Sequence, residues 1–325
     1  MRVIYIVSLF AVMTLLVLGC KSNFPSDLDA FSLDMNYATP TAGFQPILGR
    51  NTEFVDVFNA DKSTLPLTFR ISAVRAFDGS PAPELSKLFP TPIWKERYTG
   101  LETSLEEIRA KRDTLMLPLW EVNEHNGNFV MHSSSSENIL KVYPDSGYYF
   151  DVEVSNSGGR RYFKDIKLRP LPSEPYEIFP SLMMNVYGDS TLTLMNTSTV
   201  DVWFNKKGEG SSLTFKFLDR MLNPIPLSKF KDTDWKNLLH GFNPKFAADS
   251  SEVRYEVEYP IPLVPTISTK WNSGENATSV FAYSRKAFGG VVQNSSIQLN
   301  YSIFERGDWE IIFYFSDEAP LFTND

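Results

Sequence analysis

Alternation of apolar and polar residues recurs along the chain, with the period of two that is typical of half-buried β-strands. The clearest example is a run in which every second residue is apolar, at Tyr148, Phe150, Val152 and Val154. Asn156 to Gly159 has the composition of a turn, and Tyr162 to Leu168 follows as a second extended run. We therefore predict a hairpin that forms the last two strands of a β-sandwich.

Two further hairpins are expected in the first half of the chain. Phe54 to Phe58 and Leu67 to Ile71 are both extended in pattern, and the loop between them is polar. Asn126-Gly127 lies between Trp120 to Asn123 and Phe129 to Met131, and Asn-Gly is a strong hairpin signal because both residues tolerate positive φ.

The segment from Asp145 to Tyr149 resembles the tyrosine corner at the start of strand F in immunoglobulin-like domains. The corner tyrosine normally shares the inward face of its strand. Tyr149 instead shares parity with the polar residues Asp151 and Glu153. Either Tyr148 takes the corner role or a bulge intervenes.

The second half of the chain repeats the extended pattern. Val200 to Asn205 and Ser212 to Asp219 flank a glycine-rich polar segment, which predicts a hairpin between them. Further strands are expected at Val253 to Val257, Ser279 to Tyr283 and Ile297 to Phe304. After a turn, the apolar residues alternate again, at Trp309, Ile311, Phe313 and Phe315.

Two short segments are predicted to be helical insertions. Leu105 to Arg112 follows Thr103 and Ser104, either of which can act as N-cap, with Glu106 or Glu107 completing a capping box. Asp232 to His240 has an acidic or hydroxyl cap, an apolar face and a glycine after its end.

The linker and domains follow from proline content. Residues 170–175 contain three prolines, which remove ladder donors and stiffen linkers. We therefore predict an N-terminal domain at 46–169 and a C-terminal domain at 176–325. The fold class expected is all-β: two β-sandwich, immunoglobulin-like domains in series, with the two short helices as insertions.

The first residues form a leader. Arg2 precedes an apolar run that ends at Gly19, and Cys20 follows it as the only cysteine among 325 residues. The run resembles a bacterial lipobox, with Val17 where leucine is usual, and an uncleaved anchor helix is the alternative. We predict a lipoprotein signal peptide at 1–19 and a flexible tether at 20–45. The resemblance implies that Cys20 is lipidated with acyl chains that anchor the protein to a membrane.

Localisation is expected at the outer membrane. Lys21 rather than an aspartate follows Cys20, which by resemblance to known lipoprotein sorting favours that membrane. The cell surface is the favoured side, although the acidic export signal of Bacteroidetes lipoproteins is poorly matched because Asp27 comes late. The periplasmic leaflet therefore stays open as an alternative.

Charge and residue usage exclude several functions. The formal charge of −8, with Arg160-Arg161 as the main basic pair, argues against nucleic acid as a partner. A single cysteine excludes disulfide frameworks and thiolate zinc sites. His125 and His132 bracket a turn but have no third ligand assigned by the sequence, so we predict no metal and no cofactor. Nucleophile and phosphate-loop motifs are absent, so no catalytic residues are assigned.

Tryptophans supply the candidate ligand-binding residues. Trp203 and Trp309 lie at inward strand positions and Trp235 on an apolar helix face, so these three are predicted to be core residues. Trp271 lies in a polar, glycine-containing loop, where an exposed ring would suit the face of a sugar. Its alternative is an indole folded back onto its own sandwich. Trp94 with Tyr98 forms a second candidate under the same alternative.

Several segments resemble an uncharacterised lipoprotein family of Bacteroidetes, a domain of unknown function. They are turn and strand segments, at residues 59–61, 66–71, 77–85, 155–160, 233–238 and 307–313. The resemblance covers about residues 45 to 320. It implies an outer-membrane lipoprotein encoded near SusC-like and SusD-like nutrient-uptake proteins.

The function expected is therefore non-catalytic. Either the protein binds glycan or assists a SusC/SusD-type uptake complex, with the membrane, a glycan and SusC/SusD-like proteins as partners. The alternative is a structural or adhesive surface module that binds protein.

Overall fold

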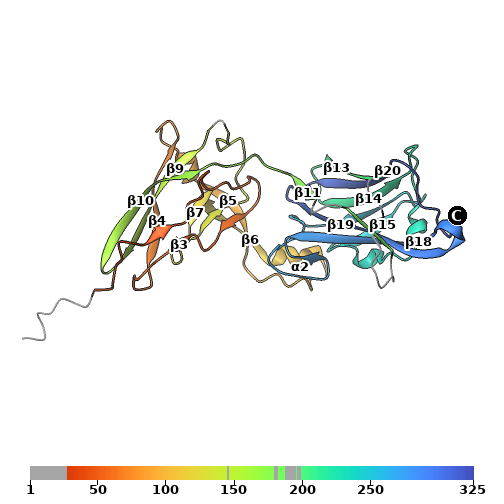
Figure 1. Cartoon of the computed structure of the whole chain (residues 1–325), viewed down its shortest axis with the longest axis horizontal. Helices are drawn as coiled ribbons and strands as arrows, with labels where there is room; N and C mark the ends of the chain where they lie inside the picture. Colours follow the sequence, from red (N-terminus) through yellow and green to blue (C-terminus); the bar gives the residue numbers. More distant parts are fainter. Residues whose placement is uncertain (1–27, 145, 179–181, 187–194, 196–198) are drawn as a thin grey trace, which may run out of the picture.

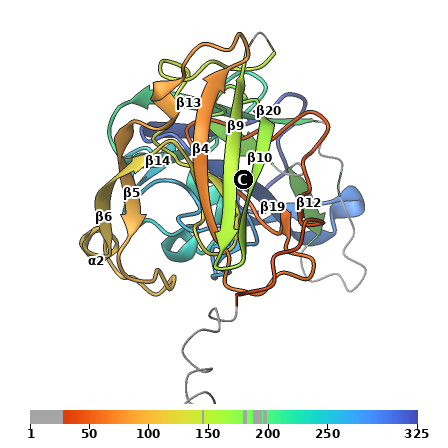
Figure 2. The ribbon, with the colours of Figure 1, turned by 90° about the vertical axis from the view of Figure 1, so that its left-hand side faces the viewer.

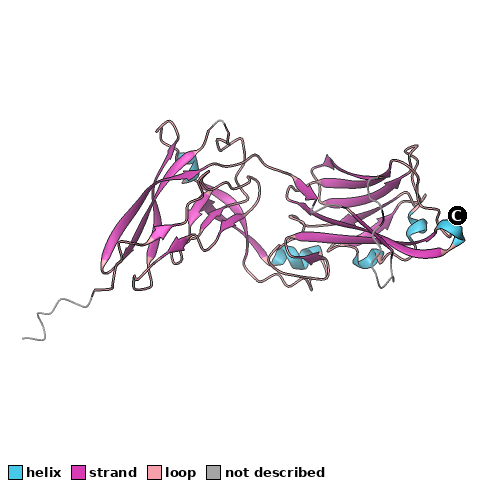
Figure 3. Ribbon diagram, viewed as in Figure 1, coloured by secondary structure: helices cyan, strands magenta, loops and turns pink. Residues whose placement is uncertain are grey.

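The computed structural model describes residues 28–144, 146–178, 182–186, 195 and 199–325. β-Strands dominate these ranges, and the helices among them are all short (Figure 3). They are η1 (Pro83–Leu85), α2 (Leu105–Ala110), η2 (Leu227–Phe230), η3 (Trp235–Asn237) and η4 (Phe288–Gly290). The all-β sandwich class is thus confirmed. Cys20 lies outside the described residues.

Three small sheets form the body of the N-terminal half. One has the order β10-β9-β4, and Figure 2 looks onto it; the others have the orders β2-β8-β7 and β1-β3. Their strands are β1 (Asn36–Tyr37), β2 (Thr52–Phe54), β3 (Phe58–Asn59), β4 (Thr68–Ala76), β7 (Trp120–Val122), β8 (Phe129–Met131), β9 (Tyr148–Asn156) and β10 (Gly159–Leu168).

The alternation in β9 places its apolar side chains in the core of this half. Tyr148, Phe150, Val152 and Val154 are fully buried. Phe150 packs edge-on against Phe129 of β8, with ring centroids 5.1 Å apart. The predicted β9–β10 hairpin and the Asn-Gly hairpin between β7 and β8 are both confirmed by antiparallel pairing.

Tyr148 takes the corner role. Its hydroxyl oxygen accepts a hydrogen bond of 2.8 Å from the backbone N–H of Lys141, seven residues upstream. Burial raises the pKa of this phenol. Of the two possibilities that the sequence left open, the structure selects Tyr148 rather than a bulge.

The hairpin predicted between Phe54 to Phe58 and Leu67 to Ile71 is wrong. β2 pairs with β8, β3 with β1, and β4 with β9. Asp56, at φ +54°, breaks the extended run between β2 and β3. A left-handed residue cannot continue a strand, so the run divides into two short strands that pair elsewhere.

The end of the predicted tether is folded. β1 pairs with β3, and Met35, Tyr37 and Phe44 are buried in the N-terminal core. Phe31, Leu33, Met35 and Tyr37 alternate with polar residues, a strand period that the prediction of a tether overlooked. The structure therefore differs from the prediction of a flexible segment up to residue 45.

Two five-stranded sheets form the C-terminal half, beside the N-terminal half along the long axis of the molecule (Figure 1). One has the order β13-β20-β14-β16-β15. The other has the order β11-β19-β18-β17, and β12 also pairs with β19. Their strands are β11 (Tyr176–Ile178), β12 (Met183–Val186), β13 (Val200–Gly208), β14 (Ser212–Leu218), β15 (Phe242–Phe246), β16 (Glu252–Glu256), β17 (Asn272–Ser273), β18 (Asn276–Lys286), β19 (Val292–Ile303) and β20 (Asp308–Phe315).

The hairpin predicted between Val200 to Asn205 and Ser212 to Asp219 is also wrong, although both strands exist. β20 lies between them, antiparallel to β13 and parallel to β14. Its run from Trp309 to Phe313 is buried at every position, on both sides of the sheet. Burial of both faces is typical of a central strand. β20 therefore lies between β13 and β14, and these two strands do not pair with each other as a local hairpin.

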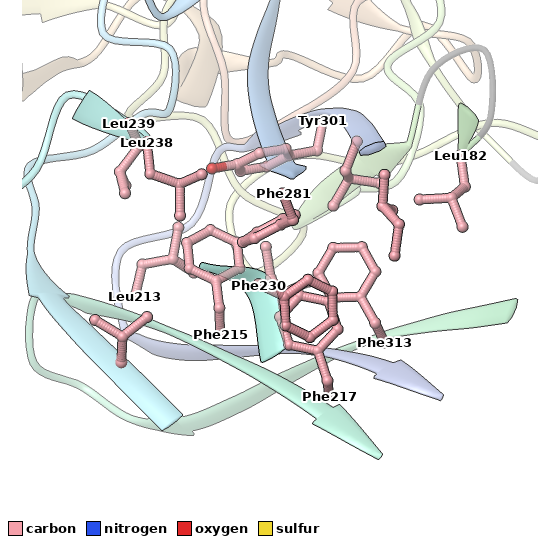
Figure 4. Packing of buried hydrophobic residues seen from close by; sticks show 14 of the residues in the cluster. Leu182, Leu213, Phe215, Phe217, Phe230, Leu238, Leu239, Phe281, Tyr301 and Phe313 are labelled. Carbon is pink, nitrogen blue, oxygen red and sulfur yellow. The ribbon is translucent and has the colours of Figure 1, made fainter. Parts of the chain in front are cut away.

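Stacked aromatic rings fill the core between these two sheets (Figure 4). Phe217 stacks on Phe230 and on Phe313, with centroid distances of 4.0 and 4.8 Å. Trp309 is buried, as predicted. Trp203 is not: its ring is 38% exposed and stacks on Tyr314 on the outer face. The inward position belongs to its neighbour Phe204, one residue out of phase with the prediction.

The two predicted helices have different outcomes. α2 is confirmed: the Ser104 hydroxyl accepts from the N–H of Glu107, whose carboxylate accepts from the N–H of Thr103. The segment Asp232 to His240 contains only the turn η3, capped by Asp234. Thr233 does not cap it, because its side chain bonds to the backbone of Ala282 on β18.

A long hairpin projects from the N-terminal half toward the C-terminal half. It consists of β5 (Leu88–Trp94), a loop, α2 and β6 (Arg112–Pro118), and we call residues 88–118 the arm. Figure 1 shows α2 at the side of the C-terminal sheets.

Buried apolar residues form one large cluster from Met35 to Leu168 and another from Leu182 to Phe322. The domain boundaries themselves stay predictions. None of the described helices is long and apolar enough to cross a membrane.

Candidate functional site

The arm docks on the C-terminal half through a small apolar cluster. Tyr98, Ile108 and Leu263 are its buried members, and Trp94 and Phe242 pack against them. Ile108 comes from α2, whose short helix presents this side chain inward because Ser104 fixes its first turn. The arm and the C-terminal sheets thus share a core of their own.

We call the boundary between the arm and the C-terminal half the seam. Glu258 adds a buried ionic contact to it. Its carboxylate accepts from Arg109 Nε at 2.7 Å and lies 3.5 Å from Arg112 Nη1. Arg112 also donates to the carbonyl of Tyr259 at 2.8 Å, and its guanidinium lies over the ring of Trp94. Burial lowers the pKa of Arg112, while the charge of Glu258 opposes that shift. Both arginines belong to the arm, so the pair joins the two halves.

Four aromatic side chains form a row along the same seam. Trp94 lies 5.4 Å from Tyr98, Tyr98 lies 5.6 Å from His240, and His240 stacks on Trp271 at 4.0 Å and 12°. The first two come from the arm and the last two from loops of the C-terminal half. The structure therefore brings together all three predicted ligand-binding residues, Trp271, Trp94 and Tyr98.

His240 joins the row by hydrogen bonds at both ring nitrogens. Nε2 lies 2.9 Å from the carbonyl oxygen of Glu102, and Nδ1 lies 2.5 Å from the Tyr98 hydroxyl. A carbonyl can only accept, so Nε2 holds the proton, and Tyr98 donates to Nδ1. Burial lowers the pKa of His240, which favours this neutral form.

Glu102 anchors the loop of the arm beside His240. Its Oε1 accepts from the N–H and the hydroxyl of Thr99, each at 2.9 Å, and from Lys111 Nζ. Burial raises the pKa of Glu102, but the bonds from Lys111 and Thr99 outweigh it and lower the pKa to about 2. The carboxylate is therefore ionised at neutral pH.

A cleft of about 1030 Å³ lies between the arm and the C-terminal half. Most of the residues that line it are polar, and His240 and Trp271 lie on one side. The arm contributes residues 99–106, and the C-terminal half contributes residues 236, 237, 240–244, 256 and 268–271. The cleft thus exists only where the arm is docked.

The candidate residues are less exposed than the sequence suggested. Tyr98 is buried, and Trp94 and Trp271 are half-buried. Lys270 Nζ lies over the Trp271 ring, 4.4 Å from its centre, and His240 stacks on the same indole, so both side chains cover part of it. The premise of a flat, open indole is therefore not met. Of the three, Trp271 is the one that lines the cleft, and its role as a ligand contact stays a prediction.

His240 and Lys270 were missed by sequence reasoning. His240 bonds to residues 142 and 138 positions away, and no local pattern signals such partners. Lys270 is adjacent to Trp271 in the sequence, and a cation next to a tryptophan in a polar loop is a signal from which its contact with the indole could have been predicted.

The paired histidines of the Asn-Gly hairpin have separate environments. His132 lies 3.0 Å from the carboxylate of Glu121, whereas His125 is exposed. Across the described parts of the chain, no three or more histidine, cysteine or acidic side chains are grouped closely enough to hold a metal ion.

Comparison with known proteins gives a family but no described relative. No curated protein matches the chain. Among solved structures, the chicken ATP-gated P2X7 receptor channel aligns at 8% identity, over 96% of this chain and 89% of that one. Its TM-score is 0.10, which supports no conclusion about fold or function.

A family model described as "Domain of unknown function (DUF5007)" matches residues 58–324. The match includes the arm, both walls of the cleft and the C-terminal sheets. The chain therefore belongs to this family of unknown function.

Proposed function

We propose that the protein is a non-catalytic, lipid-anchored glycan-binding protein of the outer membrane, which presents its cleft to sugars for a SusC/SusD-type uptake complex. The main support is the polar cleft of about 1030 Å³ with Trp271 and His240 in its wall. Carbohydrate sites combine hydroxyl, amide and charged groups with an aromatic platform. Thr99, Asn237 and Asn243 supply such polar groups here.

Two of the three carboxylates that line the cleft, those of Glu102 and Glu256, favour binding over hydrolysis. A glycosidase requires one protonated carboxyl group as general acid. The pKa of Glu102 is lowered to about 2 by Lys111 and Thr99 against the effect of burial, and that of Glu256 is lowered chiefly by its bond from Asn243. Both are therefore ionised near neutral pH, where neither can donate a proton.

Glycan binding is tested with purified protein lacking the leader, on a polysaccharide array followed by calorimetry. Trp271→Ala should weaken binding about tenfold or more, because an aromatic contact of 1–2 kcal/mol is lost. Trp271→Phe should restore part of it. Trp203→Ala is the matched control, since that ring lies on the outer face of β13. Equal binding by wild type and Trp271→Ala would remove this site.

The anchor is tested separately. Cys20→Ala should abolish incorporation of labelled fatty acid and release the protein from the membrane fraction, because no other cysteine exists to accept the diacylglyceryl group. Persistent labelling of the variant would contradict the lipoprotein assignment.

A protein-binding role is the second candidate, and one observation favours it. The tip of the β18–β19 hairpin exposes Phe288 completely, together with Val291 and Val292. Exposed apolar clusters of this kind mark contact surfaces. Capture of a surface protein by wild type but not by Phe288→Ser, in the absence of sugar, would favour this alternative.

A further inference from the structure

Two lysines on one wall of the cleft have no acidic partner. Lys236 and Lys270 line the cleft beside Trp271. Within the part of the chain that the structure describes, no carboxylate oxygen lies within 4 Å of either ammonium group. Lys270 Nζ instead donates to Asn237 Oδ1 at 2.6 Å. Both side chains are exposed.

The acidic groups of the cleft are mostly neutralised by other residues. Glu102 is paired with Lys111, and Glu256 with Lys245 at 3.4 Å. Glu106 on α2 is the remaining carboxylate of the lining, on the opposite wall formed by the arm. The wall that contains Trp271 is therefore locally cationic, in a chain whose formal charge is −8.

Lys270 also controls access to the aromatic platform. His240 stacks on the Trp271 indole with ring centroids 4.0 Å apart, and the ammonium group of Lys270 lies over the same indole, 4.4 Å from its ring centre. An exposed lysine side chain changes rotamer readily, and a cation–π contact at an exposed site is weak. A sugar ring can displace it and occupy the indole face. The displaced ammonium group then remains close enough to meet a negative group on that sugar.

We infer that the cleft selects saccharides with carboxylate groups, that is, glycans that contain uronic acids. This inference rests on the proposed glycan-binding function and specifies its ligand. Trp271 provides the face for the sugar ring, and Lys270 and Lys236 provide charge-assisted hydrogen bonds to the carboxylate.

The experiment compares two pairs of polymers, and in each pair one charged and one uncharged polymer share the same backbone. Polygalacturonate and its fully methyl-esterified form share a backbone, and dextran sulfate with dextran supplies the sulfated counterpart. Calorimetry at low and moderate salt is performed on wild type, on Lys236→Ala/Lys270→Ala and on Lys62→Ala/Lys164→Ala. The last variant loses the same charge at exposed sites of the N-terminal half.

Tighter binding of polygalacturonate than of its ester, weakened by salt and lowered about tenfold in Lys236→Ala/Lys270→Ala alone, would support the inference. Equal affinity for polygalacturonate and its ester would overturn it while the proposed function stands. Lysine-dependent binding of dextran sulfate without polygalacturonate would also overturn the assignment to uronic acids. Binding of no polysaccharide at all would remove the proposed function, and the inference with it.

Discussion

At the scale of single residues, His240 links the arm to the C-terminal half. It bonds to Tyr98 and to the backbone of Glu102 on the arm, and it stacks on Trp271 of its own half. The neutral tautomer satisfies both ring nitrogens at once. An imidazole with both nitrogens hydrogen-bonded is held in one orientation, so Trp271 lies against a fixed surface.

Glu102 provides a prediction about pH. Its pKa is lowered from the usual 4.5 to about 2, because bonds from Lys111 and Thr99 outweigh the effect of burial. A lowered folded-state pKa stabilises the protein above pH 4.5, and the stabilisation is lost as pH falls toward 2. Glu102→Gln should therefore lower the free energy of unfolding by about 2 kcal/mol at pH 7.

Urea titrations at pH 7 and at pH 2.5 measure this effect, with the exposed neighbour Glu106→Gln as control. The difference between wild type and Glu102→Gln should shrink markedly at the lower pH. A difference that does not change with pH would show that the ionised carboxylate is not the source of the stability.

Part of the site could be predicted from residues alone. Trp94, Tyr98 and Trp271 stood out because large aromatic side chains among polar neighbours need an explanation. Their convergence could not be predicted, since it depends on the docking of an arm across about 140 residues of sequence. The stacking of His240 on Trp271 could not be predicted either, because it joins two separate loops of the C-terminal half.

At the scale of elements, strands were predicted better than their pairing. The extended runs of β9, β10, β14 and β20 follow from alternation, which is a local property. The partners of β4 and β13 do not, because each strand pairs with one from a distant part of the chain. The turn η3 replaced a predicted helix because Thr233 bonds to β18 instead of capping.

The loop of the arm supplies an element-scale prediction. Gly100 has φ +75°, and a Cβ there would collide with the side chain of Thr269 on the C-terminal half. Gly100→Ala should therefore lower the free energy of unfolding by about 2–4 kcal/mol and increase hydrogen exchange in the arm. Gly79 is the matched control because it has φ +81° with no atom near the Cβ position.

Gly79→Ala should lower the free energy of unfolding by only about 1 kcal/mol, because alanine disfavours the positive φ but meets no neighbouring atom. If both variants lost the same stability and the exchange of the arm were unchanged, close packing of Gly100 on Thr269 would be ruled out as a determinant of docking.

At the scale of the whole molecule, two attachments hold the halves together. The arm is one of them. The other is Arg50, which pairs with Glu174 at 3.3 Å and with Glu177 at 2.8 Å, and lies 4.1 Å over the ring of Phe304. Since the attachments involve different segments, the molecule is braced against bending about residues 170–175.

We expect the wild type to unfold in a single calorimetric transition because of this bracing. Arg50→Ala/Glu258→Gln removes the ionic contacts of both attachments and should separate the transition into two. Removal of the Glu258 carboxylate leaves the largely buried Arg112 unpaired, at a cost of about 3 kcal/mol, whereas the pairs of Arg50 with exposed glutamates contribute less, about 1 kcal/mol. Lys206→Ala is the control, since its partners Glu209 and Glu305 lie within the C-terminal half. Two transitions already in the wild type would contradict the prediction.

The central position of β20 has a consequence for biogenesis. β20 is the last of its five strands along the chain, and its pairing of Trp203 with Ile312 spans more than a hundred residues. Until residues 308–315 have emerged, β13 and β14 each lack a neighbour and expose aromatic side chains such as Phe215. Non-local pairing of this kind slows folding, so unpaired strand edges and apolar side chains stay exposed for longer. We therefore expect the C-terminal half to be most prone to aggregation before residues 308–315 are available for pairing.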